Sequence, residues 1–454
     1  MNSSGFALPD VGGAPRRLAA AWLVLGVAAL IGSGLLAVLL VASRTPALQH
    51  IIPWRDFFRT ALVIHVDLSV LVWFLAFGGV LWSLAGSARA AALGWLAWAL
   101  CLVGTVVLAL APFSGEGNPL MNNYVPVLRQ PFFFVGLALM GVGFALLVAR
   151  TLMTVVFSFS PNSAERALGT ALFLSAAVAA VALIGFMWSW ATLPSGIEGQ
   201  SYYEILFWGG GHVLQFTHTL LACVAWFWLA HALGADIRVK PGTAGVLFIV
   251  AAAPAFAAPV IYLLYPTGSA EHIVLFTRLM EYGHLTMLPL GLALLAALWR
   301  GRSRMRANDM LSAALFCSVF VFTAGGVLGY LIRGVNVVIP AHYHGSIVGV
   351  TLAFMGLTYH LLPRLGFAAA KQRLALWQAY IFAGGQSLHI AGLAWSGGYG
   401  VQRKVAGSEQ VLRSLPEIIG MGMMGLGGLI AIIGGVLFVI VCLRSMWPRS
   451  NAVR

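Results

Sequence analysis

Two histidines separated by one residue stand in an apolar stretch of the chain, in the run Ala341-His342-Tyr343-His344-Gly345. A helix turns once in about 3.6 residues, so residues two apart point about 200° away from each other. The two rings cannot comfortably bind one metal ion, but each can hold a separate planar cofactor on its own side of the helix. Another histidine in an apolar stretch, His65, can complete one of the two sites. Two hemes flanking one helix predict a redox protein.

Ionisable side chains also occur in other apolar stretches, where they are costly in a membrane and are therefore candidates for function. His65, His212, His342 and His344 lie at similar depths in their stretches, and unrelated histidines need not agree in this way. The others are Asp67, His218, Glu281, His284 and His389. Four further histidines lie near the ends of stretches, where we expect interfacial solvation: His50, His231, His272 and His360.

The apolar stretches predict an all-α integral membrane protein with twelve transmembrane helices, because each is long enough to cross a bilayer core of roughly 30 Å. They lie at about 18–43, 57–84, 88–112, 131–155, 166–192, 203–234, 242–265, 273–299, 309–333, 339–362, 374–397 and 418–443. Short connections predict one polytopic domain over 1–454, with tails at 1–17 and 444–454. The first tail has no apolar core, so we do not expect a cleaved signal peptide.

The net charge of +13 indicates topology and not nucleic-acid binding, because most of the 26 Lys and Arg gather on one side of the predicted bundle. The densest cluster contains Arg300, Arg302, Arg304 and Arg306. The positive-inside rule then predicts cytoplasmic termini in a plasma membrane. The four cysteines form neither CxxC nor CxxCH, so no covalently attached c-type heme is expected on this chain.

These residues resemble subunit I of the heme-copper oxidase superfamily, which includes oxygen reductases and nitric oxide reductases. The resemblance covers nearly the whole chain and is strongest from Asn336 to Gly366, which looks like the family's HxH helix and the Leu-Pro segment after it. It implies that His65 and His344 are the axial ligands of a low-spin heme. It also implies that His342 is the proximal ligand of a high-spin heme with an open position for a gas.

Two further segments are similar to the family. Trp208-Gly-Gly-Gly-His212 resembles the sixth-helix segment that brings a histidine to a second metal beside the high-spin heme. His389-Ile-Ala-Gly-Leu, followed by Arg403 and Lys404, resembles the eleventh-helix segment whose basic pair meets the heme propionates. An ordinary pair of loop charges is the alternative for Arg403 and Lys404.

The sequence departs from the family at the second metal. The family has two adjacent histidines in its seventh helix, whereas the stretch 242–265 contains none, and the tyrosine expected four residues after His212 is Phe216. One imidazole does not make a copper site. Three interpretations remain: non-heme iron bound by His212, Glu281 and His284; no second metal, with the high-spin heme working alone; or a vestigial catalytic site in a chain that only moves electrons. Glu281 can also simply pair with Arg278, three residues before it.

The resemblance therefore implies a respiratory oxidoreductase that passes electrons from cytochrome c or quinol through the low-spin heme to the high-spin heme, where dioxygen or nitric oxide is reduced. The expected partners are membrane lipid and a membrane-anchored cytochrome c or another electron-donor subunit. The alternative is a non-catalytic heme protein without a second metal: an electron conduit, gas sensor or assembly factor. A transporter is disfavoured, because it would leave the agreement between His65 and the His342/His344 pair to chance.

Overall fold

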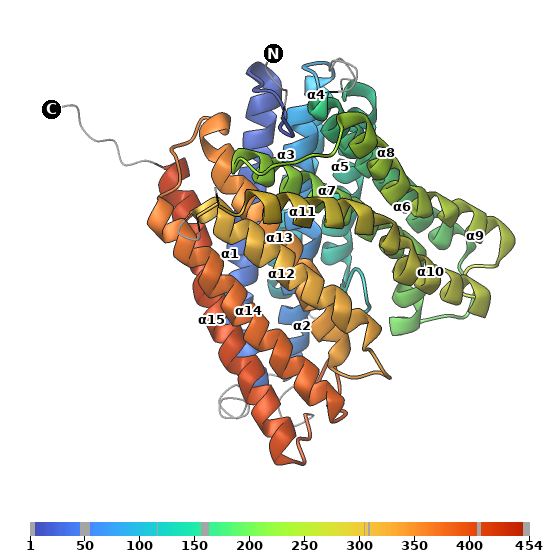
Figure 1. Ribbon diagram of the computed structural model, residues 1–454. Coiled ribbons are helices and arrows are strands. Elements are labelled where there is room, and N and C mark those ends of the chain that lie inside the picture. Colours follow the sequence, from blue (N-terminus) through green and yellow to red (C-terminus); the bar gives the residue numbers. More distant parts are fainter. Residues whose placement is uncertain are drawn as a thin grey trace. The chain divides into compact units, whose positions relative to one another are not determined.

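A computed structural model describes residues 5–45, 55–115, 117–155, 163–303, 305–306, 309–405 and 410–447. His50, Arg304 and the outer parts of both predicted tails lie outside these residues. The described chain is built almost entirely of helices (Figure 1). In chain order the elements are α1 (Gly13–Arg44), α2 (Arg55–Val66), η1 (Asp67–Val72), α3 (Trp73–Ala85), α4 (Ala91–Leu110), η2 (Ala111–Phe113), β1 (Asn118–Leu120), β2 (Val127–Arg129), α5 (Pro131–Thr154), α6 (Ala164–Thr192), α7 (Gly199–Ala232), α8 (Pro241–Ala252), η3 (Ala253–Ala257), α9 (Ala258–Leu264), α10 (Ala270–Gly283), η4 (His284–Met287), α11 (Leu288–Gly301), α12 (Met310–Tyr330), α13 (Val338–Leu365), α14 (Gln372–Gly398) and α15 (Leu415–Met446).

Eleven helical segments in the described part of the chain are long and apolar enough to cross a membrane, and each coincides with a predicted stretch. The remaining prediction, 374–397, falls on α14, which is a continuous helix of 27 residues. Polar side chains lower its hydropathy, and one of them, Gln378, is fully buried and accepts a hydrogen bond from Tyr359 Oη at 2.7 Å. The all-α membrane bundle is confirmed, and the number of twelve spans is approximate.

Three of the predicted spans contain, in their interior, a local change of helix type that the periodicity does not reveal. The second span includes the π-helical turn η1, which begins two residues after His65. The seventh and eighth spans include the 3-10 turns η3, which contains Pro254, and η4, which begins at His284. A proline removes a backbone donor, and π turns often occur at functional sites. A short antiparallel pair, β1 and β2, was also not expected.

One compact unit consists of Met1–Gly26 and Leu71–Met305. In it α4 packs on α5, α6 packs on α7 and α8, and both α10 and α11 pack on α7. Small residues permit the closest approaches: a Cβ on Gly104 would lie 2.7 Å from the backbone nitrogen of Met140. Such glycine contacts are typical of helix packing in membranes.

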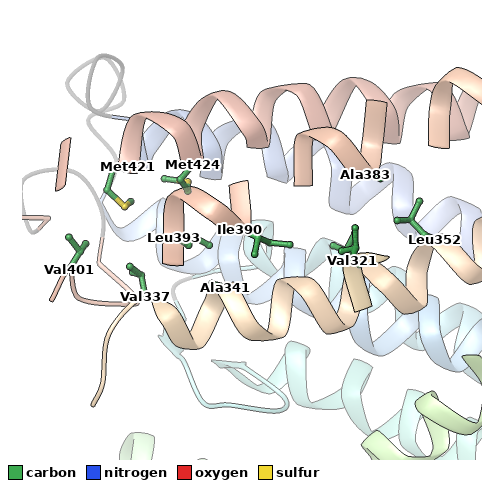
Figure 2. Packing of buried hydrophobic residues seen from close by; sticks show 11 residues of the cluster. Val321, Val337, Ala341, Leu352, Ala383, Ile390, Leu393, Val401, Met421 and Met424 are labelled. Carbon is green, nitrogen blue, oxygen red and sulfur yellow. The ribbon is translucent and has the colours of Figure 1, made fainter. Parts of the chain in front are cut away.

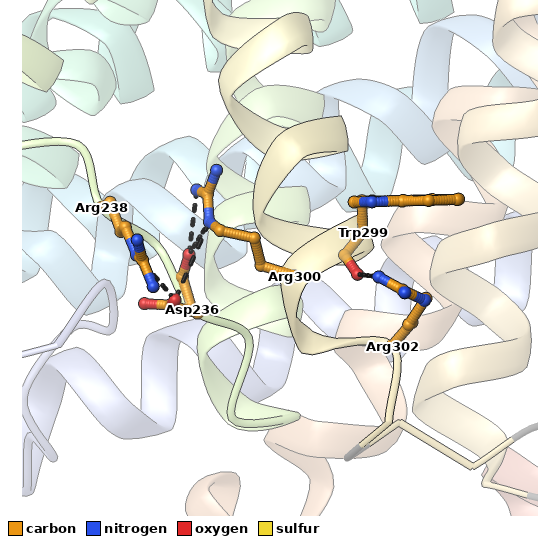
Figure 3. Close-up of polar contacts among 5 residues, drawn as sticks. All are labelled: Asp236, Arg238, Trp299, Arg300 and Arg302. Carbon is orange, nitrogen blue, oxygen red and sulfur yellow. Dashed lines mark hydrogen bonds and ion pairs between the residues drawn. The ribbon is translucent and has the colours of Figure 1, made fainter.

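Polar contacts gather where the α7–α8 connection meets the end of α11, within the same unit (Figure 3). Asp236 Oδ2 pairs with Arg238 at 2.8 Å and with Arg300 at 3.8 Å, and its carbonyl oxygen accepts from Arg300 Nη2 at 3.1 Å. The guanidinium of Arg302 lies 4.3 Å from the centre of the Trp299 ring. The connection after the sixth predicted span and the connection after the eighth therefore lie at the same end of the unit. This is expected, because the chain reverses direction at every span.

The second compact unit consists of Val27–Val70 and Arg306–Arg454, in which α12 packs on α13 and α14 packs on both α13 and α15. Its apolar core gathers residues from these four helices and from the loop at Val401 (Figure 2). Ala341, directly before His342, is fully buried in this cluster together with Val337. The core therefore fixes the start of α13, which carries both histidines. The predicted single domain over 1–454 stays a prediction.

Gly427→Ala should destabilise this second unit. A Cβ at Gly427 would overlap the backbone nitrogen of His389 on α14, so the two helices would have to separate. Overpacking of this kind costs about 1–3 kcal/mol, and we expect a lower midpoint of thermal unfolding. Gly422→Ala, on the same helix with nothing near its Cβ, is the matched control. Equal midpoints for the two variants would contradict the close α14–α15 packing.

Candidate functional site

His342 and His344 both lie in the first turns of α13, within the second unit. His342 Nδ1 lies 2.7 Å from the carbonyl oxygen of Gly325 on α12. A Cβ on Gly329, one turn later in α12, would come within 2.8 Å of the His342 ring. Two glycines of α12 thus provide the acceptor and the space that set the orientation of this imidazole.

His65 lies in the last turn of α2, two residues before the π turn η1 begins, and belongs to the same unit. Its Nδ1 lies 2.9 Å from both the carbonyl oxygen and the hydroxyl of Ser33, on α1. The Ser33 hydroxyl donates in turn to the His65 carbonyl at 3.3 Å. Ser33 is buried, so these bonds are shielded from water.

His344 interacts electrostatically with His65, His389 and Arg44. Its ring centre lies 4.8 Å from that of His389 on α14, with 59° between the planes. The structure therefore brings together His65 and His344, the pair that the resemblance implies for a low-spin heme. His389 and Arg44 join them, although neither was predicted to be a ligand.

Arg44 is the cation of this group. Its Nε donates to Gln410 Oε1 at 3.4 Å, while Nη2 is buried without a hydrogen-bond partner among the described residues. Tyr343 interacts electrostatically with both Arg44 and Arg403. Arg403 therefore lies near the end of α13 that carries the histidines. Lys404 follows it in the same loop in a left-handed conformation, with φ of 63°.

The ring hydrogen bonds determine which nitrogen of each histidine carries hydrogen. A carbonyl oxygen only accepts, so a ring nitrogen that bonds to it must be an N–H. His65 donates from Nδ1 to Ser33, His342 to Gly325, and His389 to Met424 at 2.8 Å. Each neutral ring then has its lone pair on Nε2, which is the arrangement found in histidines that bind metals. The donor set in the second unit fits heme iron.

His212 lies on α7 in the first unit, fully buried. Its Nδ1 lies 2.7 Å from the Trp208 carbonyl oxygen and 2.8 Å from the Tyr124 hydroxyl oxygen. By the same argument Nδ1 is protonated and Nε2 has the lone pair. Tyr124 comes from the connection after β1, and burial raises the pKa of its hydroxyl well above 10, so it stays neutral near pH 7. Gly211 leaves room for the Tyr124 ring.

His284 and Glu281 lie on neighbouring turns beside α7 but differ in surroundings. The His284 ring stacks on Phe216 at 4.0 Å, and its Nδ1 donates to the Met280 carbonyl at 3.0 Å. The Glu281 side chain is 37% exposed and pairs with Arg278 at 3.5 Å. This ion pair is the alternative to metal binding that the three-residue spacing of Arg278 and Glu281 allowed. The iron site of His212, Glu281 and His284 stays a prediction.

His272 is fully buried, and neither ring nitrogen has a hydrogen-bond partner among the described residues, so the expected interfacial solvation is wrong for it. It packs on Tyr262 and Phe276 at ring-centre distances of 5.0 and 4.9 Å. His212 interacts electrostatically with both His272 and His284. These two are twelve residues apart along one helical segment, which is about 18 Å, so they cannot share one metal ion with His212.

The donor set of the first unit therefore does not fit a copper centre with three imidazoles. Among the residues described, no three His, Cys, Asp or Glu side chains are arranged to hold a metal ion. A heme needs only one or two axial ligands from the protein, so this result concerns the second metal alone.

Comparisons with known proteins agree with the fold. A sequence model of the family described as Cytochrome C and Quinol oxidase polypeptide I matches residues 17–437. An uncharacterized protein of Rickettsia prowazekii is 30% identical over 501 residues, covering 95% of this chain and 96% of that protein. Cytochrome c oxidase subunit 1 of Thermus thermophilus is 23% identical over 459 residues, covering 87% and 77%.

An uncharacterized protein of Aquifex aeolicus is 28% identical over 361 residues, covering 79% of this chain and 88% of that protein. Among solved structures, a heme-copper terminal oxidase, determined as a dimer by cryo-electron microscopy, superposes with a TM-score of 0.75 at 16% identity. It covers 98% of this chain and 86% of its own.

Proposed function

Because the chain belongs to the cytochrome c and quinol oxidase polypeptide I family, we propose that it passes electrons from cytochrome c or quinol through a low-spin heme to a high-spin heme that reduces dioxygen or nitric oxide. The observation that carries this proposal is the placement of His342 and His344 on α13, with His65 in electrostatic range of His344. The ring bonds of His65 and His342 favour a lone pair on Nε2, as iron ligation requires.

His65 and His344 would hold the low-spin heme. Two imidazoles on one iron supply fast electron transfer, because the coordination changes little between the oxidation states. The protein's part is to fix the ligands: Ser33 sets the His65 ring through two oxygen atoms, and Arg44 supplies a positive charge beside His344. Arg403 and Lys404 would balance heme propionates at this end of α13.

His342 would hold the high-spin heme on the other side of α13. An iron with one protein ligand keeps a position open for a gas. Gly325 orients the His342 ring by accepting its Nδ1 hydrogen, and Gly329 leaves space for the ring. Because His342 and His344 point away from each other, one helix can serve both cofactors while keeping their ligands separate.

A non-catalytic heme protein is the second candidate: an electron conduit, gas sensor or assembly factor. The observation that favours it is the donor set around His212. His272 and His284 are too far apart to complete a three-imidazole site, and Glu281 pairs with Arg278. Catalysis without copper would use the high-spin heme alone or with non-heme iron at His212, Glu281 and His284.

The protein is a multi-pass membrane protein, and we place it in the plasma membrane with both termini cytoplasmic. The basic residues Arg238, Arg300 and Arg302 at one end of the first unit support this orientation. Electrons would come from a membrane-anchored cytochrome c or another donor subunit, since the chain has no CxxCH motif for a heme of that kind.

A reduced-minus-oxidised visible spectrum combined with metal analysis tests the proposal. We expect two hemes per chain, with copper well below one per chain, because the described residues of the first unit offer no three-imidazole set. Consumption of dioxygen or nitric oxide with an artificial electron donor separates the enzyme from the non-catalytic alternative. Absence of heme would refute both.

The metal analysis should be repeated on His212→Ala. The copper content is expected to stay low in the variant and in the parent protein, while any non-heme iron falls. His218→Ala, which removes another histidine of α7, is the control. Copper at one per chain that disappears in His212→Ala but not in the control would restore an ordinary copper site and overturn this prediction.

A further inference from the structure

His389 is a buried imidazole whose orientation is fixed by α15, the helix packed along its own. Its Nδ1 donates to the Met424 carbonyl at 2.8 Å. The close approach depends on glycines: a Cβ on Gly428 would lie 3.2 Å from His389 Nδ1, and one on Gly427 would overlap the His389 backbone. α14 and α15 are therefore close enough here for the Met424 carbonyl oxygen to accept the His389 hydrogen bond with its second lone pair.

This fixed bond leaves His389 with an unused acceptor. With Nδ1 as the donor, the lone pair of the neutral ring is on Nε2. Among the described residues the ring hydrogen bond of His389 is the one from Nδ1 to Met424, so Nε2 can accept a further hydrogen bond. The ring of His389 contacts that of His344, and the two ring centres are 4.8 Å apart.

The His344 ring lacks a hydrogen-bond acceptor among the described residues. His65 and His342 each have a carbonyl that holds Nδ1, whereas no hydrogen bond of the His344 ring is recorded among the described residues. If its Nε2 binds iron, its Nδ1 carries hydrogen and needs an acceptor. Two imidazoles joined by a nitrogen-to-nitrogen hydrogen bond have centres about 5 Å apart, which is close to the observed separation.

We propose that His389 is the positioning residue of His344: in the heme-loaded protein, His344 Nδ1–H donates to His389 Nε2, and Met424 anchors His389. A rotation of the His344 ring alone closes this bond, while His389 keeps its bond to Met424. The relay runs from the Met424 carbonyl through His389 to His344 and rests on the proposed low-spin heme at His65 and His344. It gives His344 the orienting partner that the backbone supplies for the other two histidines.

The bond has an electronic consequence. Donating its Nδ1 hydrogen makes His344 a more basic ligand. A more basic ligand stabilises ferric over ferrous iron, so the relay lowers the midpoint potential of the low-spin heme. The unpaired Nε2 lone pair of His389 is satisfied at the same time.

The test compares His389→Leu, which fills similar space without an acceptor, with His389→Gln, which keeps one. Ser387→Ala is the control, because the Ser387 hydroxyl donates to the Ala383 carbonyl within α14. Potentiometric titration of the low-spin α-band gives the midpoint potential, and electron paramagnetic resonance of the ferric protein reports the ligand field. His389→Asn, whose amide is too short to reach His344, replaces the leucine variant if that variant does not accumulate in the membrane.

In His389→Leu we expect the reduction equilibrium to shift about tenfold toward ferrous iron, which for a one-electron couple is about 59 mV upward, together with changed g-values. His389→Gln and Ser387→Ala should match the parent protein. An unchanged potential and unchanged g-values in both His389→Leu and His389→Asn would overturn the inference. So would loss of the low-spin spectrum in His389→Leu with its retention in His344→Ala, because His389 would then be the ligand itself.

A failure of the proposed function can be distinguished from a failure of the His389 relay. If the parent protein has no low-spin heme, both the heme assignment and the relay are wrong, and this is visible before any variant is made. If the parent has the heme and the leucine variant is indistinguishable from it, only the relay is wrong.

Discussion

His65→Ala and His344→Ala should each remove the low-spin α-band from the reduced-minus-oxidised spectrum, while the protein remains in the membrane. Each variant deletes one of the two imidazoles proposed to hold the iron, and His344 has His65 and His389 as its histidine neighbours. The loss of folding stability in either variant should be small. His65→Ala gives up ring hydrogen bonds to Ser33, worth about 1 kcal/mol each, and both variants stay within a bundle held by many helix contacts.

Two controls separate ligation from folding. His218→Ala removes a half-buried histidine whose buried Nδ1 has no hydrogen-bond partner among the described residues, and it should keep the full band. Ser33→Ala removes the hydroxyl beside His65 but keeps the Ser33 carbonyl, so the band should persist. A complete bis-histidine spectrum in both His65→Ala and His344→Ala would show that the assignment is wrong.

His342→Ala should abolish carbon monoxide binding by the reduced protein and keep the low-spin band. Carbon monoxide needs ferrous iron with an open position, and we propose that His342 is the only protein ligand of that heme. His344 points away from His342 on the same helix, so its own heme should be untouched. Loss of the His342–Gly325 bond should cost about 1 kcal/mol, too little to unfold the bundle.

The matched control is His360→Ala, on the same helix and far from the pair. It should bind carbon monoxide as the parent protein does. Added imidazole, which can enter the space left by His342→Ala, should restore part of the difference spectrum. Carbon monoxide binding that survives in His342→Ala refutes the ligand assignment, and its absence from the parent protein favours the electron conduit.

The sequence by itself determined the family and the course of the chain through the membrane. Its apolar stretches coincide with the helices because helix length in a bilayer depends on local composition. The heme-copper oxidase subunit I fold is confirmed by the family match over residues 17–437 and by the superposition on a solved oxidase. The opposite orientation of His342 and His344 follows from the helical repeat alone.

Only the tertiary structure decided what surrounds each histidine. Ser33 and His65 are 32 residues apart, His389 and Met424 are 35 apart, and Tyr124 and His212 are 88 apart. Periodicity carries no information at these separations, because a side chain's hydrogen-bond partner depends on which helices pack together and at what depth. For the same reason the burial of His272 could not be read from its place near the end of an apolar stretch. Local sequence sets where a helix runs; packing between distant helices decides which ring nitrogen is left to bind a metal.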